Sequence, residues 1–207
     1  MSDHLYSDHA LLSTAYLPPV DYFRAIRMHG GYFIERWENY QKQSYRNRCC
    51  IYSANGVLPL VIPVVRIGSR QPITEVKIDY TKDWQKQHWR AIHSAYKSTP
   101  FFDHYQDEIY PFYSSVKEEL LFNMNNKLLS VILDILGLSS ELNYTADYKE
   151  ERPNDFRNSI HPKRASPIIP DTNIEYHQLF AHKYGFAANL SIIDLLFNEG
   201  PDILLYI

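Results

Sequence analysis

The pattern that most restricts the fold lies in the first 37 residues. An apolar run at 10–16 stops at Pro18-Pro19, a segment at 20–29 repeats apolar residues at helical spacing, and Gly30-Gly31 precedes a second apolar run at 32–37. Proline lacks the N–H that a strand ladder requires, and glycine is typical of the residue that ends a helix. The predicted order is therefore strand, helix, strand, which is the parallel unit of α/β proteins.

The next stretch predicts an antiparallel hairpin. Two strand-like runs, 48–53 and 57–65, flank Asn55-Gly56, and both turn residues tolerate the positive φ of a type I′ turn. Two prolines in the second run favour an edge or bulged strand. Residues 73–80 then alternate apolar and charged side chains, so we expect another, half-exposed strand there. A parallel unit followed by a hairpin predicts a mixed sheet.

Three longer helices are predicted in the rest of the chain. One is expected at 84–97, with Asp83 as its cap. Two capping-box patterns, Ser115–Glu118 and Ser191–Asp194, are expected to open the other two. The first of these is expected to end at Gly137.

The segment between the last two helices has a weaker pattern. A short strand is expected at 142–148, and 149–171 is polar and rich in proline. A long loop of this kind within a domain is commonly functional or disordered. Because no repeat or domain boundary is visible, we predict one α/β domain over 1–207, with a mixed, partly parallel sheet and flanking helices.

Charge and hydropathy argue against several classes of partner. The net charge is −3 and the pI is about 6.3, which argues against a general nucleic-acid binder. The longest apolar candidate, 57–67, is too short for a membrane span and is broken by prolines, so no membrane insertion is expected. The amino-terminal MSDHLYSDH lacks the basic start and apolar run of a secretory signal, which predicts a cytoplasmic location.

Cysteine and histidine spacing predict no metal site. Cys49 and Cys50 are adjacent, so a disulfide between them would be strained, and we expect small strand residues on opposite faces. The histidines show neither i, i+4 pairs nor an HExxH motif. His88 is kept as a candidate acid or base because it shares the predicted helical stripe of Trp84. The alternative for His88, a hydrogen-bonded core imidazole, is the more common role.

The segment 39–48 is the most distinctive candidate for binding an anion. It combines cations, amides and phenols just before a predicted strand, and its candidate ligand-binding residues are Lys42, Tyr45, Arg46, Asn47 and Arg48. Arginine binds phosphate or carboxylate through two parallel hydrogen bonds, and tyrosine offers a stacking surface. The alternative is a solvated loop whose charges pair with Glu35 and Glu38.

The strand-to-helix junction at 14–19 is a second candidate position. Ligands of open α/β sheets gather at the carboxyl ends of strands, and helix amino termini favour anions. Tyr16 and Tyr22 are the residues expected to line a ligand there, and Glu35 joins His88 as a candidate catalytic residue. The junction lacks the glycines of a phosphate-binding loop, so it matches no named nucleotide motif, and the sequence leaves the identity of any cofactor unknown.

Short motifs spread from residue 10 to 201 resemble the WbqC-like protein family. They are Tyr16-Leu17-Pro18, Tyr22-Phe23, Tyr45-Arg46-Asn47-Arg48 with Ile51, Asn55-Gly56, Pro63-Val64, the set Trp84, His88, Ile92 and Tyr96, Pro100 with Phe102, and the tail Leu190–Pro201. The chain departs from the family pattern at Ser13-Thr14, where members usually have Gln-Pro, and at Pro19 and Asp21, where they usually have Trp and Gly. A longer glycine-bearing section of many members is absent between Gly137 and Tyr176.

The resemblance implies a step on an activated sugar, because the family is associated with O-antigen and other surface-polysaccharide gene clusters. We therefore expect a transferase-type enzyme that acts on a nucleotide-linked or other anionic sugar precursor. In this hypothesis Arg46 and Arg48 hold phosphate, the tyrosines line the sugar or base, and His88 or Glu35 moves the proton. The alternative is a non-catalytic module that binds a carbohydrate precursor or a partner enzyme. A third hypothesis is a purely structural role in a homodimer whose interface uses the aromatic segment 101–113.

Overall fold

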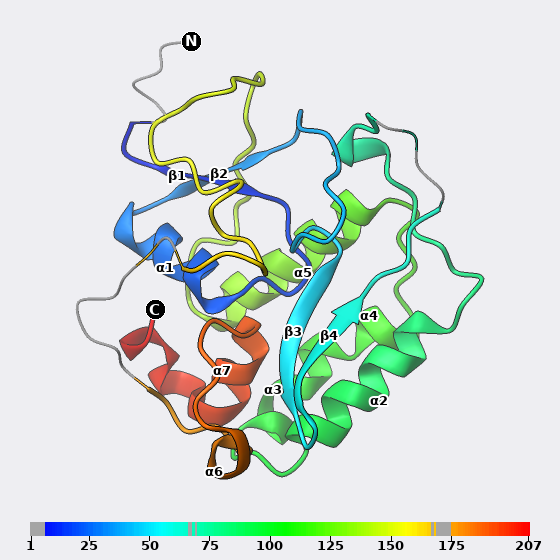
Figure 1. Ribbon diagram of the computed structural model, residues 1–207, viewed down its shortest axis with the longest axis vertical. Helices are drawn as coiled ribbons and strands as arrows, with labels where there is room; N and C mark the ends of the chain where they lie inside the picture. The colour runs from blue at the N-terminus through cyan, green and yellow to red at the C-terminus, as the bar shows by residue number, and fades with distance from the viewer. Residues whose placement is uncertain (1–6, 66–67, 69, 167, 169–174) are drawn as a thin grey trace.

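The parallel unit at the amino terminus is present as predicted. The computed structural model describes residues 7–65, 68, 70–166, 168 and 175–207. Strands β1 (Ala10–Ser13) and β2 (Tyr32–Glu35) pair in parallel, and helix α1 (Val20–Met28) connects them (Figure 1). Every residue of β1 is buried, so this strand lies in the interior, as parallel strands usually do.

Two isolated bridges widen this parallel layer on both sides. Leu11 pairs in parallel with Asp155, and Ile34 pairs in parallel with Tyr144. The backbone N–H of Leu11 donates to the Asn154 carbonyl at 2.9 Å. The strand predicted at 142–148 is thus reduced to a single bridge. Because all these pairings are parallel, four chain segments present their carboxyl ends at one edge.

The predicted hairpin is also present. β3 (Arg48–Ser53) and β4 (Gly56–Val61) pair antiparallel, and Gly56 has the positive φ of 94° that the turn requires. Cys49 is buried and Cys50 half-buried, and both are free thiols, in agreement with the prediction that they point to opposite faces. β4 has no second neighbour among the described strands, so it is an edge strand and tolerates Pro59, which has no N–H to donate.

The prediction of a strand at 73–80 is wrong. Residues Ile73–Glu75 form a 3₁₀ turn, and only single bridges follow at Lys77 and Ile78. The alternation does report burial, since Val76 and Ile78 are buried while Lys77 is exposed. The α/β class is confirmed, but the parallel pair and the hairpin form two separate sheets in the described part of the chain.

Helices pack around both sheets. They are α2 (Trp84–Tyr96), α3 (Phe102–Ile109), α4 (Pro111–Ser114), α5 (Leu121–Ile135), α6 (Ala181–Tyr184), α7 (Ile192–Glu199) and a 3₁₀ helix at Gly200–Leu205. Figure 1 shows α5 passing near the carboxyl ends of β1 and β2, while α2 lies beside the hairpin. Most rings of the aromatic segment 101–113 pack inside the chain, and Tyr110 is its exposed member.

The predicted helix caps are wrong in their details. The Ser115 hydroxyl donates to the Pro111 carbonyl at 3.3 Å, and α5 begins only at Leu121. Ser191 does precede α7, but its hydroxyl donates to the Leu17 carbonyl at 2.9 Å instead of capping the helix. Asp83 precedes α2 without a side-chain cap bond. Tertiary partners compete successfully with local caps at these positions.

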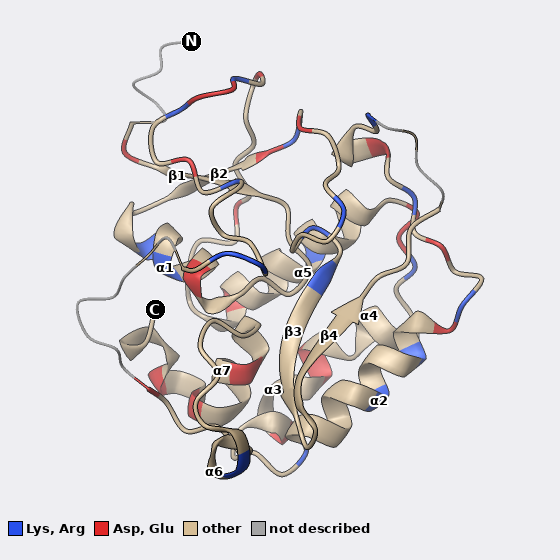
Figure 2. Cartoon of the chain, viewed as in Figure 1, with Lys and Arg blue, Asp and Glu red and all other residues tan. Residues whose placement is uncertain are grey.

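One cluster of buried apolar side chains joins the parallel layer, the hairpin and the helices. Lys and Arg are interspersed with Asp and Glu over the fold, as Figure 2 shows. None of the helices that the structure describes has the length and apolar character needed to cross a bilayer. The carboxyl edge of the parallel layer is where buried charges concentrate.

Candidate functional site

The carboxyl edge gathers residues from distant parts of the sequence. β1 ends at Ser13 and β2 at Glu35, while Thr145 and Arg157 follow the two bridged segments. In open α/β sheets, ligands bind outside the carboxyl ends of parallel strands. This edge is therefore the position that the topology assigns to a site.

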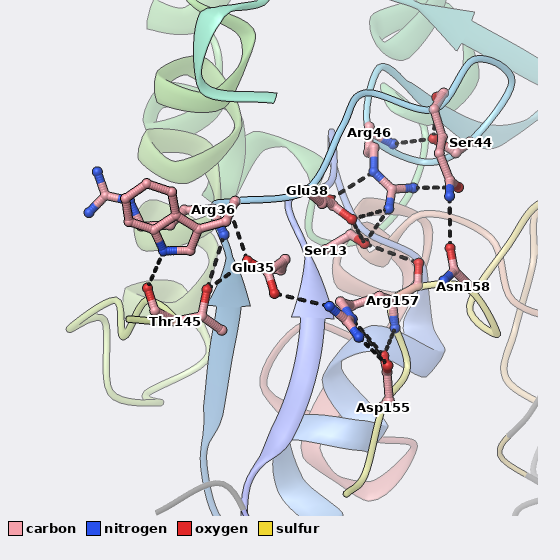
Figure 3. Close-up of polar contacts among 12 residues, drawn as sticks. Ser13, Glu35, Arg36, Glu38, Ser44, Arg46, Thr145, Asp155, Arg157 and Asn158 are labelled. Carbon is pink, nitrogen blue, oxygen red and sulfur yellow. Dashed lines mark hydrogen bonds and ion pairs between the residues drawn. The ribbon is translucent and has the colours of Figure 1, made fainter. Parts of the chain in front are cut away.

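A buried set of polar contacts, here called the carboxyl-edge network, holds this edge together (Figure 3). It comprises Ser13, Glu35, Glu38, Arg46, Thr145, Asp155 and Arg157. Glu35 is fully buried and accepts hydrogen bonds from the Thr145 hydroxyl at 2.8 Å and from the Arg157 guanidinium at 3.0 Å. Its carboxylate also accepts the Trp37 backbone N–H at 2.8 Å. Glu35 thus fixes the chain that leaves β2.

The second acidic residue of the network neutralises Arg46. The Arg46 Nε donates to Glu38 Oε1 at 2.8 Å, and the neighbouring Nη2 pairs with Glu38 Oε2. The same Nη2 donates to the Ser13 hydroxyl at 2.7 Å. Burial raises the pKa of Glu38, and the Arg46 guanidinium and the Ser13 hydroxyl act against that rise. Arg46 is therefore a buried, paired cation: its pairing with Glu38 agrees with the alternative given for 39–48, but its burial differs from the solvated loop expected there.

The cavity beside Arg46 has almost no free volume. It is lined by Leu12, Ser13, Thr14, Ala15, Tyr22, Tyr45, Arg46, Phe156, Arg157 and Ile160, and its volume is about 10 Å³. A cavity needs roughly 10–15 Å³ to hold one water molecule. Arg46, Tyr22 and Tyr45 do meet around one hollow, but that hollow is filled by the protein itself.

The remaining residues predicted from 39–48 point to different surroundings. Lys42 is exposed, and the buried Asn47 amide donates to the Ile62 carbonyl at 2.8 Å. Arg48 is half-buried, and its Nε has no hydrogen-bond partner in the described residues. The structure therefore does not assemble these five side chains around a common ligand space.

His88 and two tyrosines lie in aromatic core contacts. The Tyr16 hydroxyl is 2.9 Å from His88 Nδ1 and 2.7 Å from the Tyr113 hydroxyl. Burial lowers the pKa of His88 to about 4. The Tyr22 hydroxyl donates to the Ser13 carbonyl at 3.0 Å. His88 thus has the hydrogen-bonded, neutral character of a core imidazole, whereas Glu35 lies at the carboxyl edge.

A larger pocket opens at the same edge, between β2, α5 and the segment around Tyr144. This cavity, here called the Arg36 pocket, has a volume of about 430 Å³ and is lined by Arg36, Phe122, Asn123, Asn126, Lys127, Ser130, Leu142 and Tyr144. Its volume lies within the range of about 300–1,000 Å³ that is usual for small-molecule sites. The sequence did offer a signal for it, because the polar residues Asn123, Asn126 and Lys127 lie among the apolar residues of this helix.

Contacts within the Arg36 pocket tie it to the strand ends. Asn126 donates to the Tyr144 hydroxyl at 3.3 Å and accepts from the Thr14 hydroxyl at 3.4 Å. Thr14 directly follows β1, Arg36 directly follows β2, and Tyr144 bridges to Ile34. The pocket therefore occupies the crevice outside parallel strand ends.

Arg36 gives this pocket a positive charge. Its side chain is exposed, and its guanidinium carbon lies 5.3 Å from the Trp37 ring and 5.8 Å from the Tyr144 ring. In Figure 3 it points away from the carboxyl-edge network. Within the described residues it makes no ion pair, whereas Lys127 pairs with Glu118. Arg36 thus presents an unneutralised, aromatic-flanked cation to the pocket.

No group of three or more His, Cys, Asp or Glu side chains is placed to hold a metal ion in the part of the chain that the structure describes. The carboxylates at the carboxyl edge are already engaged by arginines and hydroxyls. The pocket at this edge is lined instead by arginine, amide and aromatic side chains, together with Lys127, Ser130 and Leu142.

Comparisons with known proteins agree with the resemblance noted in the sequence. The chain is similar to the protein named Uncharacterized protein Rv1507c from Mycobacterium tuberculosis (strain ATCC 25618 / H37Rv), with 29% identity over 228 aligned positions that cover 95% of this chain and 97% of the relative. No solved structure matches the chain significantly. The model of the WbqC-like protein family matches residues 14–166, which include the Arg36 pocket and every residue of the carboxyl-edge network except Ser13. The chain therefore belongs to the WbqC-like protein family.

Proposed function

We propose that this protein is a transferase-type enzyme that binds a nucleotide-linked or other anionic sugar precursor in the Arg36 pocket. The observation that carries the proposal is the Arg36 guanidinium, which lines a cavity of about 430 Å³ and makes no ion pair within the described residues. Its family is associated with polysaccharide biosynthesis loci, which supports a sugar precursor as substrate.

The pocket's chemistry fits a nucleotide-linked sugar. An arginine fork binds two phosphate oxygens at once, whereas Lys127, which also lines the pocket, is already paired with Glu118. Phe122 and Tyr144, whose ring centroids are 5.7 Å apart, offer aromatic surface to a base. The amides of Asn123 and Asn126 have donors and acceptors for ribose or sugar hydroxyls. This arrangement moves the proposed phosphate contact from Arg46 and Arg48 to Arg36.

Glu35 is the better placed of the two proposed proton-transfer residues. It lies at the end of β2, one residue from Arg36, whereas His88 is hydrogen bonded to Tyr16 in the core. In a transfer reaction the acceptor hydroxyl forms the new bond and loses its proton, while the nucleotide leaves with the electrons of the broken bond. We propose that Glu35 takes this proton, and that the Arg36 guanidinium balances the charge on the departing phosphate.

Thermal unfolding with nucleotide sugars tests the binding part of the proposal. UDP-glucose and GDP-mannose at about 100 times their Kd should stabilise the fold by about 2.7 kcal/mol, which corresponds to a rise in Tm of roughly 5–10 °C. Arg36→Ala should abolish the rise, and Arg36→Lys should retain part of it because it keeps the charge but loses the fork. Arg70→Ala, at another exposed arginine, is the matched control and should behave like the unmodified chain.

Mass spectrometry tests the transfer itself. Incubation with a nucleotide sugar and an acceptor glycan should yield free nucleotide and a heavier acceptor, and Glu35→Gln should remove both products while leaving the thermal shift in place. A panel of nucleotide sugars that causes no shift would refute the Arg36 pocket as their site.

A non-catalytic binding module is the second candidate, and one observation favours it. Glu35 is fully buried and hydrogen bonded to Thr145, Arg157 and the Trp37 backbone, so its proton-accepting positions are occupied in this state. Nucleotide-sugar binding that depends on Arg36 would support this module if no donor and acceptor pair yields a product.

A further inference from the structure

A second cavity is lined by Trp37, the residue that follows Arg36. It has a volume of about 240 Å³ and is lined by Trp37, Glu38, Asn39, Tyr40, Gln41, Tyr148, Arg157 and Asn158. We call it the Trp37 pocket. The two pockets share no lining residue, but the Arg36 guanidinium carbon of one lies 5.3 Å from the Trp37 ring of the other. Adjacent residues of the chain thus line the two pockets.

Two exposed aromatic rings face the Trp37 pocket and are held in place by buried groups. Trp37 is 53% exposed and Tyr148 is 52% exposed. The Trp37 indole N–H donates to the Thr145 carbonyl at 3.0 Å, and the Arg157 guanidinium carbon lies 5.1 Å from the Tyr148 ring. Large exposed aromatics of this kind are typical of binding surfaces, where the flat apolar face of the ring can pack against a ligand.

The polar wall of the pocket consists of ordered amides. Gln41 donates to Asn158 Oδ1 at 2.9 Å, and its own oxygen accepts from the Arg46 guanidinium at 3.1 Å. Arg46 in turn is fixed by Glu38. The buried ion pair thus orients Gln41 and, through it, Asn158. Each amide keeps a second N–H for a ligand, and Asn39 supplies another amide beside them.

The charges at this pocket disfavour a phosphate. Arg157 is matched by Asp155 and Glu35, and Arg46, which adjoins it, is matched by Glu38. The acidic residue Glu38 is itself among the lining residues. In contrast to the Arg36 pocket, no cation of the described lining is left unpaired, so a neutral ligand with many hydroxyls fits best.

We propose that the Trp37 pocket binds one neutral sugar residue of a carbohydrate acceptor. The apolar face of a pyranose ring would lie on Trp37 or Tyr148, while its hydroxyls would bond to the amides of Gln41, Asn158 and Asn39. The volume equals that of about eight water molecules, which suits a single sugar ring. Sugar binding here follows from the pocket alone, whereas the acceptor role rests on the proposed transferase function.

Saturation-transfer NMR tests this binding directly. The probes are the methyl glycosides of glucose, galactose, mannose, rhamnose and N-acetylglucosamine. At least one should receive saturation from the protein at its ring C–H protons, and the signal should disappear in Trp37→Ala and fall at least several-fold in Tyr148→Ala. Tyr148→Ala is the decisive variant because that exposed ring can be removed with little effect on folding, which circular dichroism checks. Tyr110→Ala removes an equally exposed aromatic elsewhere and should leave the signal unchanged.

The two proposals fail in different ways. Arg36→Ala should abolish the thermal shift caused by UDP-glucose and leave the glycoside signal, and Tyr148→Ala should do the opposite. If no glycoside shows saturation transfer, or if the signal survives in folded Tyr148→Ala and Trp37→Ala, the Trp37 pocket is not a sugar site. Glycoside binding without any transfer product would uphold the pocket and reject its role as acceptor site.

Discussion

At the scale of single residues, the buried pair of Glu38 and Arg46 determines the electrostatics of the carboxyl edge. Both side chains are almost fully buried, and Ser13 and Gln41 satisfy further groups of the guanidinium. A buried pair contributes little net stability compared with apolar residues, but removal of one partner leaves an uncompensated charge. Arg46 is therefore a structural cation whose loss has a large cost.

Arg46→Met should destabilise the fold by about 3–5 kcal/mol, because Glu38 would remain buried without its partner. Replacement of both residues, Arg46→Met with Glu38→Leu, should recover much of this loss. Urea denaturation at pH 7 measures both free energies of unfolding. Lys42→Met, on the same segment but exposed, should change the free energy by no more than about 0.5 kcal/mol. A single variant as stable as the unmodified chain would show that Arg46 is not part of a costly buried pair.

At the scale of elements, α7 is joined to α2 and to the segment around Tyr176 through one carboxylate. Asp194 accepts hydrogen bonds from the Tyr96 hydroxyl at 2.8 Å and from the Tyr176 hydroxyl at 2.7 Å, and Gln178 donates to it at 3.0 Å. Burial raises the pKa of Asp194 to about 6, and these three hydrogen bonds act against that rise. The residue predicted as part of a helix cap is instead a buried junction between elements.

The raised pKa of Asp194 predicts a particular dependence of stability on pH. In the unfolded chain this carboxyl titrates near 4, so between about pH 4 and 6 it is ionised when unfolded and protonated when folded. The stabilisation that Asp194 adds to the free energy of unfolding is therefore complete below pH 4 and is lost as the pH rises through 6. The change amounts to about 3 kcal/mol. Asp194→Asn should remove this decline. Denaturation curves at intervals from pH 4 to 7 for both chains measure the difference, and parallel curves would contradict the assignment.

The end of α7 depends on Gly200. This residue has a φ of 53°, and a Cβ atom there would lie 2.5 Å from the Phe101 ring. Gly200→Ala should destabilise the fold by about 2 kcal/mol or more, since it combines backbone strain with overpacking. Gly137→Ala is the control, because Gly137 also has a positive φ of 65° but has nothing within 4 Å of the added atom. It should cost only about 1 kcal/mol, so equal losses in thermal unfolding would exclude the steric contribution.

The success of sequence-based prediction also differed between elements. The parallel unit and the hairpin were predictable because their signals are local: helical spacing between prolines and glycines, and Asn55-Gly56 between two strand-like runs. Residues 73–80 misled the prediction because alternation reports which side chains are buried. It does not report whether a neighbouring strand supplies hydrogen bonds. The caps failed because Ser115 and Ser191 found partners elsewhere.

At the scale of the whole molecule, the candidate site depends on contacts that the sequence does not display. The pairing of Arg46 with Glu38 spans eight residues and was one of the alternatives visible in the sequence. Glu35 and Arg157 are 122 residues apart, and Ile34 meets Tyr144 only through a bridge from a long loop. The sequence thus located the carboxyl edge but not the residues that surround its open cavities. Arg36 was overlooked because it stands alone, outside the cation-rich segment.

The four residues 35–38 at the end of β2 are buried at both ends and exposed in the middle, and this pattern has a thermodynamic consequence. Glu35 and Glu38 are anchored in the interior, while Arg36 and Trp37 between them form walls of the two cavities. A ligand that immobilises this tetrapeptide from one cavity reduces the ordering entropy that remains for a ligand in the other. Occupancy of the two sites is then reciprocally linked, so each ligand should raise the affinity for its neighbour by the same factor.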